Sequence, residues 1–532
     1  MSRRRCNFSA VLVCVLALPT TIAIAQQVQT GPEIINETHH DTSIPVRFLA
    51  TMATHPANKA VLPLHRRPGP PFVAREAVAA EETVQQFPMP EVATTSFHNF
   101  DGLRDRDRVA PPDTNASVGA TQVVETTNLS YQVFNKSTAA SVFGPAEISS
   151  IWSGFGGVCG TSSNSFSDPV VLYDKAANRW LVTILGSSNG FASGVGCVAV
   201  SSTSDATGSY HRYSFSFGTN RLNDYPKFGV WPDAYYASYN MFSPNAFVGA
   251  KVCAYNRSHM LAGLSANAVC FQRMIPSRPS AIDFSFLPSD RDGSTAPPAG
   301  EPNFFLELFT TTTLDLFKFH VNFTTPSSST FTGPATLTVN SFTEACALTG
   351  TCIPQSGTTQ KLDSLGDRLM FRLAYRNFGD HEALVAAHTV KSSSTASAVR
   401  WYEIRSPNGT PKIFQQGTFS ISGLALWMPS IGMDKLGDIA LGFSKSSGTT
   451  HPGLGYTGRI PSDPLGSMES AANIFVGAGS QTGNLSRWGD YSSMSIDPSD
   501  NCTFWYTNEY IPSNGSFNWR TRLFAFKFTA CH

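Results

Sequence analysis

A strand, a tight turn and a second strand recur along this chain with a similar residue pattern. The pattern runs through DPVVLYDKAANRWLVTIL (168–185), SIGMDKLGDIALGFS (430–444) and DYSSMSIDPSDNCTFWYTNEY (490–510). Aspartate or asparagine stands at each turn, where its side chain can hydrogen-bond the local backbone and tolerate unusual dihedral angles. Recurrence over roughly 40 to 65 residues, with room for four strands in each interval, is typical of a β-propeller.

These anchors predict an all-β fold, a seven-bladed β-propeller that forms a single domain over residues 93–532. The expected blades cover 106–150, 168–218, 226–275, 280–342, 357–420, 425–478 and 486–530. The last blade lacks a fourth strand, so we expect the segment from Thr95 to Asp101 to supply it and close the ring. The rival fold is a pair of β-sandwiches, but these need a linker between two domains and the sequence offers none.

The start of the chain has the character of an export signal. Basic residues at Arg3 to Arg5 precede an apolar stretch that closes on Ala23-Ile24-Ala25, which predicts a signal peptide over residues 1–25. A membrane anchor is the competing interpretation, but the stretch is short and Pro19 interrupts it. We therefore expect a secreted protein, extracellular or periplasmic, monomeric and without stable membrane insertion.

Residues 26–92 are rich in proline and have no sustained periodicity, as in HRRPGPP (65–71). This composition predicts a poorly ordered leader.

Eight cysteines remain after the predicted signal peptide, an even number that indicates disulfides in an oxidising compartment. The alternative is that some are buried free thiols. Pairing each cysteine with its neighbour in the sequence predicts Cys159–Cys197, Cys253–Cys270, Cys346–Cys352 and Cys502–Cys531.

The charge balance excludes one class of partner. Lysine plus arginine equals aspartate plus glutamate at 38 each, and no basic stripe of the kind that binds a phosphate backbone is visible. We therefore expect no nucleic-acid partner.

Polar residues gather where the inner strand of each predicted blade begins. In a propeller these positions converge at one mouth of the central channel, and clustered carboxylates with arginine and aromatic side chains can bind and cleave a sugar. The alternative is that each aspartate only caps a turn. Besides Asp224 and Asp367, the set comprises the candidate catalytic residues Asp113, Asp168, Asp233 and Asp490 and the candidate substrate-binding residues Arg487, Trp488 and Tyr491.

A second polar group lies in DRLMFRLAYRNFGDHE (367–382). Arg368, Arg372 and Arg376 share strand parity and therefore point the same way. They could bind an acidic sugar, with Arg372 and Arg376 contacting the substrate, or form ion pairs between blades. His381 is a candidate acid or base, although a lone histidine in a loop is more often only solvated.

Several signatures are missing from the sequence: GxSxG, HExxH, a Walker loop and CxxC. The stretch SDRDGSTA (289–296) is an imperfect match to the Asp-box turn of sialidase-type propellers. Its Asp290 and Asp292 could ligate Ca²⁺, but the full set of calcium ligands is absent. We expect no cofactor and no other metal.

The motifs PPDTN (111–115), DPVVLYD (168–174), DYPKFGVWPDAYY (224–236), RLAYRNFGDHE (372–382) and RWGDYSSMSIDP (487–498) resemble a group of large secreted bacterial β-propeller proteins. The resemblance spans most of residues 105–531, and a more distant likeness to sialidase-type propellers rests on the Asp-box alone. It implies export and a propeller fold, but it carries over no catalytic residue.

The sequence therefore predicts an extracellular carbohydrate-active protein, a glycoside hydrolase or polysaccharide lyase with its site at the channel mouth. The alternative from another class is a non-catalytic propeller module that binds a glycan or a protein in adhesion.

Overall fold

The computed structural model describes residues 29–49, 60–69, 71–72, 84–85, 87–161, 165–244, 246–274, 282–392 and 396–532. The predicted signal peptide lies outside the described residues. Described helices are few and short: α1 (Val46–Leu49), α3 (Arg257–Ala262) and the 3-10 turns η2 (Ile148–Trp152) and η3 (Pro326–Ser328). None of them is long and apolar enough to span a membrane.

The described chain contains seven antiparallel units of four strands each. The first three units are β5 (Asn115–Val118), β6 (Gln122–Thr127), β7 (Ser130–Asn135) and β8 (Ser141–Glu147); β9 (Ser165–Asp174), β10 (Arg179–Ser187), β11 (Val195–Ser201) and β12 (Tyr210–Ser216); β13 (Leu222–Val230), β14 (Tyr235–Ser243), β15 (Ala246–Tyr255) and β16 (Asn267–Arg273). The fourth and fifth are β17 (Leu287–Asp292), β18 (Asn303–Thr310), β19 (Thr313–His320) and β20 (Thr330–Thr338); β23 (Met370–Asn377), β24 (Glu382–Lys391), β25 (Ser397–Arg405) and β26 (Lys412–Phe419). The last two are β27 (Ala425–Met433), β28 (Ile439–Ser447), β29 (Thr450–Arg459) and β30 (Ala472–Phe475); β31 (Ser493–Ile496), β32 (Phe504–Tyr510), β33 (Arg520–Phe528) and β3 (Thr94–Arg104).

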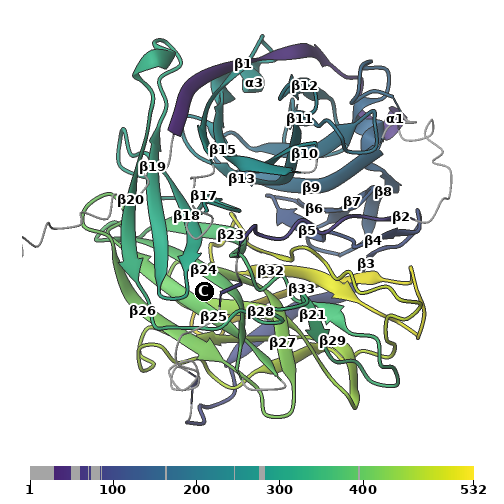
Figure 1. Cartoon of the computed structure of the whole chain (residues 1–532), viewed down its shortest axis with the longest axis vertical. Coiled ribbons are helices and arrows are strands. Elements are labelled where there is room, and N and C mark those ends of the chain that lie inside the picture. Colours follow the sequence, from purple (N-terminus) through teal and green to yellow (C-terminus); the bar gives the residue numbers. More distant parts are fainter. Residues whose placement is uncertain are drawn as a thin grey trace, which may run out of the picture.

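The first strand of each unit contacts the first strand of the next, and β31 contacts β5. These inner strands therefore form a closed ring, and the units follow one another around the molecule in sequence order (Figure 1). The fold is all-β and propeller-like.

Burial along the strands follows from this stacking. All nine residues of the inner strand β27 are buried, because neighbouring units cover both of its faces. The outer strand β20 instead has only Phe331 and Leu337 buried, since one of its faces meets solvent. The core between units is rich in aromatic rings, as where Tyr236 of β14 meets Phe319 of β19 edge-on with centroids 5.3 Å apart.

The recurring aspartates of the inner turns accept backbone hydrogen bonds. Asp174 Oδ1 accepts from the Ala177 amide at 3.1 Å, and Asp497 Oδ1 accepts from the Ser499 amide at 2.8 Å. Asn178 closes the first turn with a φ of 54°, in the left-handed region that asparagine tolerates. At these turns the repeat is explained by local structure.

The last unit takes its outer strand from the other end of the chain. β3 pairs antiparallel with β33, from Thr94 opposite Phe528 to Arg104 opposite Arg520. The predicted closure by the segment around Thr95 to Asp101 is confirmed. Figure 1 shows the yellow C-terminal strands beside β3.

Part of the predicted leader is ordered, contrary to the expectation for residues 26–92. β1 (Gln29–Thr42) pairs with β12 on one side and β16 on the other, which joins two units into one sheet. The outer strands of two neighbouring units leave unpaired backbone groups, and β1 satisfies them. β2 (Ala60–Val61) pairs in parallel with β4 (Val109–Ala110), again from within the leader. The last small sheet is formed by β21 (Thr351–Ile353) and β22 (Leu362–Asp363).

All four predicted disulfides form. They join Cys159 to Cys197, Cys253 to Cys270, Cys346 to Cys352 and Cys502 to Cys531. The first two and the last are fully buried and cross-link neighbouring strands or turns, whereas Cys346–Cys352 closes a short loop near the surface.

Candidate functional site

Three aspartates meet at the end of the ring where the inner strands begin, which we call the mouth. Asp113 lies two residues before β5, Asp168 lies in the first half of β9, and Asp490 lies three residues before β31. Carboxylate oxygens of the three lie within 4.8 Å of one another, and the residues are 1 to 7% exposed. These three residues are called the mouth cluster below.

The backbone helps to bring the mouth cluster together. Asp113, Asp168 and Asp490 have φ values of 51°, 55° and 49°, in the left-handed region. Aspartate is among the few residues other than glycine that adopt this conformation readily. The same local geometry therefore aims a carboxylate inward from three separate units.

Asp113 has the most unusual environment of the three. Neither of its carboxylate oxygens accepts a hydrogen bond from the described residues. Burial raises the pKa of Asp113 well above its usual range, and the negative charges of Asp490 and Asp168 raise it further. A proton on Asp113 can be donated to Asp168, whose own pKa is raised to about 6 by burial and by the charge of Asp224.

Arg487 donates from Nη1 to Asp490 Oδ1 at 2.5 Å and from Nη2 to Asp490 Oδ2 at 2.7 Å. The same arginine donates to Asp363 Oδ2 at 2.8 Å, while Asp363 Oδ1 accepts from the Trp488 amide at 2.8 Å. Burial raises the pKa of Asp363 to about 7, against the opposing effect of Arg487. A bidentate arginine of this kind fixes the orientation of a carboxylate as well as balancing its charge.

Lys227 supplies a second buried cation beside the mouth cluster. Its Nζ lies 3.4 Å from the ring centroid of Tyr225 and 4.0 Å from that of Tyr491, and it donates to the Pro226 carbonyl at 2.9 Å. Burial lowers the pKa of Lys227 to about 8, although the charges of Asp168 and Asp113 oppose this. The aromatic faces stabilise the ammonium group by cation–π attraction.

Sequence reasoning missed Asp363 and Lys227. Lys227 stands between apolar residues in DYPKFGVW, and a lysine at an inner-strand position is a signal of a buried charge partner. Asp363 carries no such signal, because it reaches Arg487 from the short strand β22, 124 residues away in the sequence.

Trp488 and Tyr491 are predicted substrate-binding residues that the structure buries completely. Trp488 packs against Trp427 and donates from Nε1 to Ser444 at 3.2 Å. Tyr491 donates its hydroxyl to the Pro169 carbonyl at 2.9 Å. Both side chains are packed inside the protein next to the mouth, so neither ring face is free to stack on a sugar.

Arg372 and Arg376 lie away from the mouth, further along β23. Arg372 donates to Asp290 Oδ2 at 3.1 Å, to Asp292 Oδ2 and to the Met494 carbonyl. Arg376 donates from Nε to the Met433 carbonyl at 3.0 Å. Of the two interpretations left open by the sequence, the structure supports ion pairing between units for Arg372.

Two predicted catalytic residues lie at the opposite end of the ring. Asp233 is exposed in the turn after β13 and accepts from the Tyr236 hydroxyl at 3.2 Å. His381 lies in the turn after β23, paired with Asp380 at 2.7 Å. The prediction that they join the mouth aspartates is therefore wrong, because both follow an inner strand instead of preceding it.

The calcium site considered at Asp290 and Asp292 does not fit the structure. Arg372 binds both carboxylates, Lys175 approaches Asp292 at 3.4 Å, and the Val230 amide donates to Asp290. These cations and donors already satisfy the charge that calcium would neutralise.

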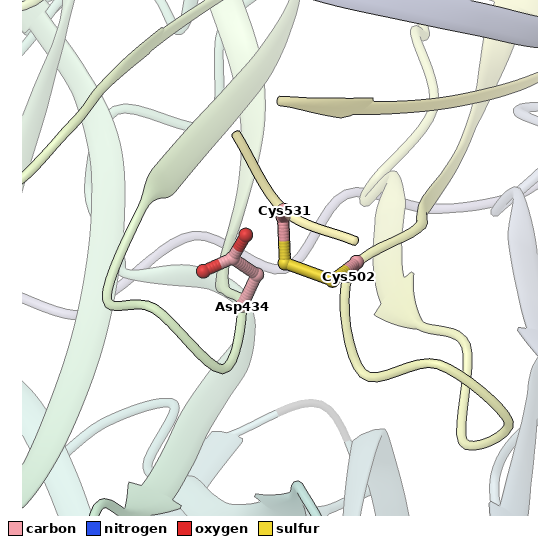
Figure 2. Close-up of side chains that lie close together, drawn as sticks. All are labelled: Asp434, Cys502 and Cys531. Atoms are coloured by element: carbon pink, nitrogen blue, oxygen red, sulfur yellow. A yellow bond between two sulfur atoms is a disulfide. The ribbon is translucent and has the colours of Figure 1, made fainter. Parts of the chain in front are cut away.

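Asp434 lies beside Cys502 and Cys531, a grouping that could suggest metal ligands. Figure 2 shows the two sulfurs joined in a disulfide next to the Asp434 carboxylate. Cysteine binds metals as a thiolate, and a disulfide contains no thiolate. Asp434 instead accepts the backbone amides of Leu436 and Asp438 at 2.8 and 3.0 Å.

A cavity of about 20 Å³ lies at the mouth, between Asp113, Asp168 and Asp490 on one side and residues 62–65 on the other. It has room for a water molecule. Chemically, the mouth cluster combines a carboxyl group whose pKa is raised by burial with a carboxylate bound by arginine, and such a contrast in surroundings is typical of an acid and base pair.

No family model matches the chain, and no curated protein is found to be similar in sequence. Solved structures with some likeness include an exo-β-1,3-galactanase from Phanerochaete chrysosporium, with 10% identity, a TM-score of 0.31, and coverage of 68% of this chain and 81% of that one. An α-L-arabinanase from Penicillium chrysogenum has 11% identity and a TM-score of 0.32 over 58% of this chain and 94% of its own. The WD40 domain of SCAP from fission yeast has 7% identity and a TM-score of 0.31 over 81% of each chain. Similarity this weak assigns neither a family nor an activity to the chain.

Proposed function

We propose that the seven four-stranded units are the blades of a seven-bladed propeller, that residues 93–532 form this single domain, and that residues 1–25 are a signal peptide. The closed ring of inner strands supports the blade count. The four disulfides support export, since such bonds persist in oxidising compartments.

The proposed function is that of an extracellular glycoside hydrolase that acts at the mouth. One observation carries it: two neighbouring carboxyl groups, Asp113 and Asp490, have opposite electrostatic environments. Asp113 is buried without a hydrogen-bond donor, whereas Arg487 binds Asp490 through two nitrogens. Pairs of titratable groups whose surroundings differ in this way mark acid and base roles.

In the proposed reaction Asp113 donates its proton to the glycosidic oxygen as the bond to the anomeric carbon breaks. The Asp490 carboxylate attacks that carbon, and water deprotonated by Asp113 then displaces Asp490. Retaining enzymes have carboxyl groups about 5 to 5.5 Å apart, while inverting enzymes need about 6.5 to 9.5 Å to hold a water molecule. The short separation within the mouth cluster, under 4.8 Å between oxygens, favours retention.

The test is a screen of polysaccharides for new reducing ends and for unsaturated products. Residues 62–65 border the mouth cluster and restrict access to it. The screen therefore also uses an Arg66→Ala variant, in which the ion pair between Arg66 and Glu344 that holds this segment is lost. Any activity should fall by more than 100-fold in Asp113→Asn and Asp490→Asn and stay unchanged in the control Asp233→Asn at the far end of the ring. Unsaturated products would assign a lyase instead.

A non-catalytic glycan- or protein-binding propeller, as in adhesion, is the second candidate. The observation that favours it is the burial of the mouth cluster, which leaves at most 7% of each aspartate exposed. If the protein binds a glycan on an array, and neither the intact chain nor the Arg66→Ala variant releases a product from any glycan, the binding function is supported and hydrolysis is refuted.

A further inference from the structure

Residues 60–69 lie across the mouth and are called the covering segment. At its start the Ala60 amide donates to the Arg108 carbonyl at 2.9 Å and the Leu62 amide to the Ala110 carbonyl at 2.8 Å. These bonds extend the β2–β4 pairing and direct the chain over Asp113, which follows β4 by only three residues.

The covering segment satisfies polar groups that surround the mouth cluster. Arg487 donates from Nε to the Leu62 carbonyl at 3.0 Å, and Arg368 donates from Nη2 to the His65 carbonyl at 2.7 Å. His65 Nδ1 lies 3.1 Å from Asp224 Oδ2. A peptide thus occupies hydrogen-bonding groups that would otherwise face an incoming ligand.

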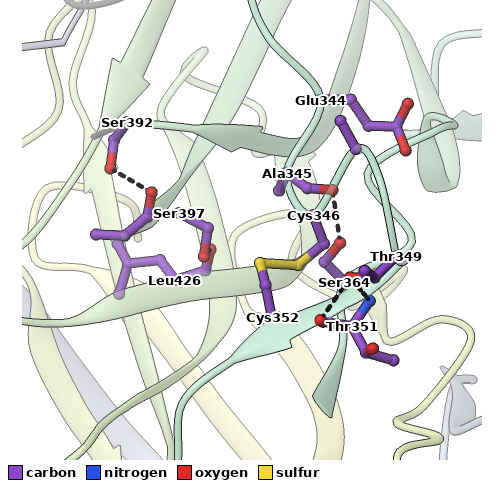
Figure 3. The surroundings of a disulfide bond; sticks show 12 residues. Glu344, Ala345, Cys346, Thr349, Thr351, Cys352, Ser364, Ser392, Ser397 and Leu426 are labelled. Atoms are coloured by element: carbon purple, nitrogen blue, oxygen red, sulfur yellow. Dashed lines mark hydrogen bonds between the residues drawn. A yellow bond between two sulfur atoms is a disulfide. The ribbon is translucent and has the colours of Figure 1, made fainter. Parts of the chain in front are cut away.

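The far end of the covering segment is anchored beside a disulfide loop. Arg66 pairs with the buried Glu344 at 2.5 Å, and the Arg67 amide donates to Asp367 Oδ2 at 2.8 Å. Figure 3 shows that Glu344 immediately precedes the loop closed by Cys346 and Cys352.

The segment leaves too little space for a sugar. The cavity of about 20 Å³ beneath it is far smaller than the roughly 300 to 1,000 Å³ of ordinary ligand pockets. Leu62, Leu64 and His65 line this cavity together with Asp113, Asp168 and Asp490. Any ligand of the mouth cluster must therefore displace the covering segment.

The covering segment is held less firmly than the strands beneath it. None of its ten residues is fully buried, and Val61 is 54% exposed. Leu64 packs against the core and the His65 ring lies 4.4 Å from that of Phe242, but both side chains are only partly buried. Segments that bury little of their surface open locally below the global unfolding free energy. The mouth cluster, in contrast, belongs to the rigid ring.

We propose that residues 60–69 are an internal inhibitory ligand of the mouth, a peptide that blocks the candidate site until it is displaced. Its effect on turnover rests on the proposed hydrolase function, but the blockage itself rests on the contacts above. The groups recognised are two peptide carbonyls, bound by Arg487 and Arg368, and two basic side chains, bound by Asp224 and Glu344.

The test uses the full chain and its Arg66→Ala variant, with hydrogen–deuterium exchange as the first measurement. Arg66 is one-third exposed, so its removal should leave the fold intact, yet it strips a hydrogen-bonded charge from buried Glu344. We expect exchange at the amides of Leu62 and Arg67 to become about tenfold faster, and Arg66→Lys to restore part of the protection. The matched control is Arg47→Ala, which removes another exposed ion pair of the N-terminal region, with Asp205, and should leave the covering segment unchanged.

The second measurement adds a synthetic peptide of residues 60–69 to the Arg66→Ala chain. The peptide should restore protection around Asp113 and suppress any glycan cleavage that the variant gains. Unchanged exchange in Arg66→Ala together with no effect of the peptide would overturn the proposal. Faster exchange and peptide binding without cleavage of any glycan would leave the blockage standing and refute the hydrolase function.

Discussion

Replacing Glu125 by glutamine tests a buried carboxyl group at the seam where the ring closes. Glu125 of β6 is fully buried, and its two oxygens accept from the Leu103 amide of β3 at 2.9 Å and from the Thr507 hydroxyl of β32 at 3.0 Å. Glu125 thereby joins the first unit to β3 and β32, the two parts of the last unit that come from opposite halves of the sequence. No cation lies among these partners, and burial raises the pKa of Glu125 to about 7.

The sign of the pH effect follows from this shift. A carboxyl group whose pKa is higher in the folded than in the unfolded protein stabilises the fold at low pH, and this contribution is lost as pH rises through the folded pKa. With pKa values of 4.5 unfolded and about 7 folded, the intact chain should lose about 2.5 kcal/mol of stability between pH 5 and pH 8 from this group. Glutamine cannot ionise and can keep both hydrogen bonds, since the Thr507 hydroxyl can accept as well as donate.

The assay is urea unfolding of the intact chain and of Glu125→Gln at intervals from pH 5 to 8. The unfolding free energy of Glu125→Gln minus that of the intact chain should increase by about 2.5 kcal/mol from pH 5 to pH 8. All other titrating groups are common to the two proteins, so their contributions cancel in this difference. The exposed Glu91→Gln serves as a control whose difference should stay flat. If the difference for Glu125→Gln does not change with pH, the pKa of Glu125 is not raised in the folded protein and the reasoning is refuted.

Three further outcomes are expected. Arg487→Met should cost about 3 to 5 kcal/mol in urea unfolding, since it leaves Asp363 and Asp490 buried without their cation; a cost below 1 kcal/mol would contradict the pairing. Burial alone lowers the pKa of His65, but the hydrogen bond and charge of Asp224 and the charge of Asp168 outweigh this and the effect of Arg368, so the pKa is raised. The stabilisation of the covering segment by protonated His65 should thus be complete below pH 6.5 and weaken as pH rises through the raised pKa. The measurement is the hydrogen-exchange rate of the Leu62 amide in the intact chain and in His65→Gln at each pH. Identical pH profiles of the two proteins would exclude this effect. Replacing Cys346 and Cys352 by serine should cost about 2 kcal/mol by chain entropy for this six-residue separation and speed exchange in residues 60–69, and unchanged exchange would show that the loop does not support Glu344.

Much of the architecture could be predicted because it depends on local patterns. The turn at Asp174 and Asn178 is formed by side chains that bond the adjacent backbone, so a short stretch of sequence is enough to recognise it. The disulfides followed the same logic, since each joins cysteines that are neighbours in the sequence. The closing strand could be predicted because the last unit was one strand short and sheet edges demand a partner.

The candidate site could be predicted only in part. Asp113 and Asp490 precede an inner strand and Asp168 lies in the first half of one, so strand direction alone brings all three to one end of the ring. Asp233 has the same sequence character as these three, but it follows its strand and lies at the other end. Telling the two cases apart requires the boundaries of β13, which residue patterns define poorly.

By itself, the sequence determined the repeat, the β-strand content, the cysteine pairs and the candidate aspartates of the mouth cluster. Only the tertiary structure decided that Lys227 lies beside this cluster as a buried cation and that Asp363 shares Arg487 with Asp490. It also decided that Arg372 belongs to another ion-pair network and that residues 60–69 lie over the mouth. The physical reason is range. Turns and hairpins are stabilised by groups a few residues apart, whereas the charge on a buried carboxylate is set by whatever side chains the closed ring brings near it from any position in the chain.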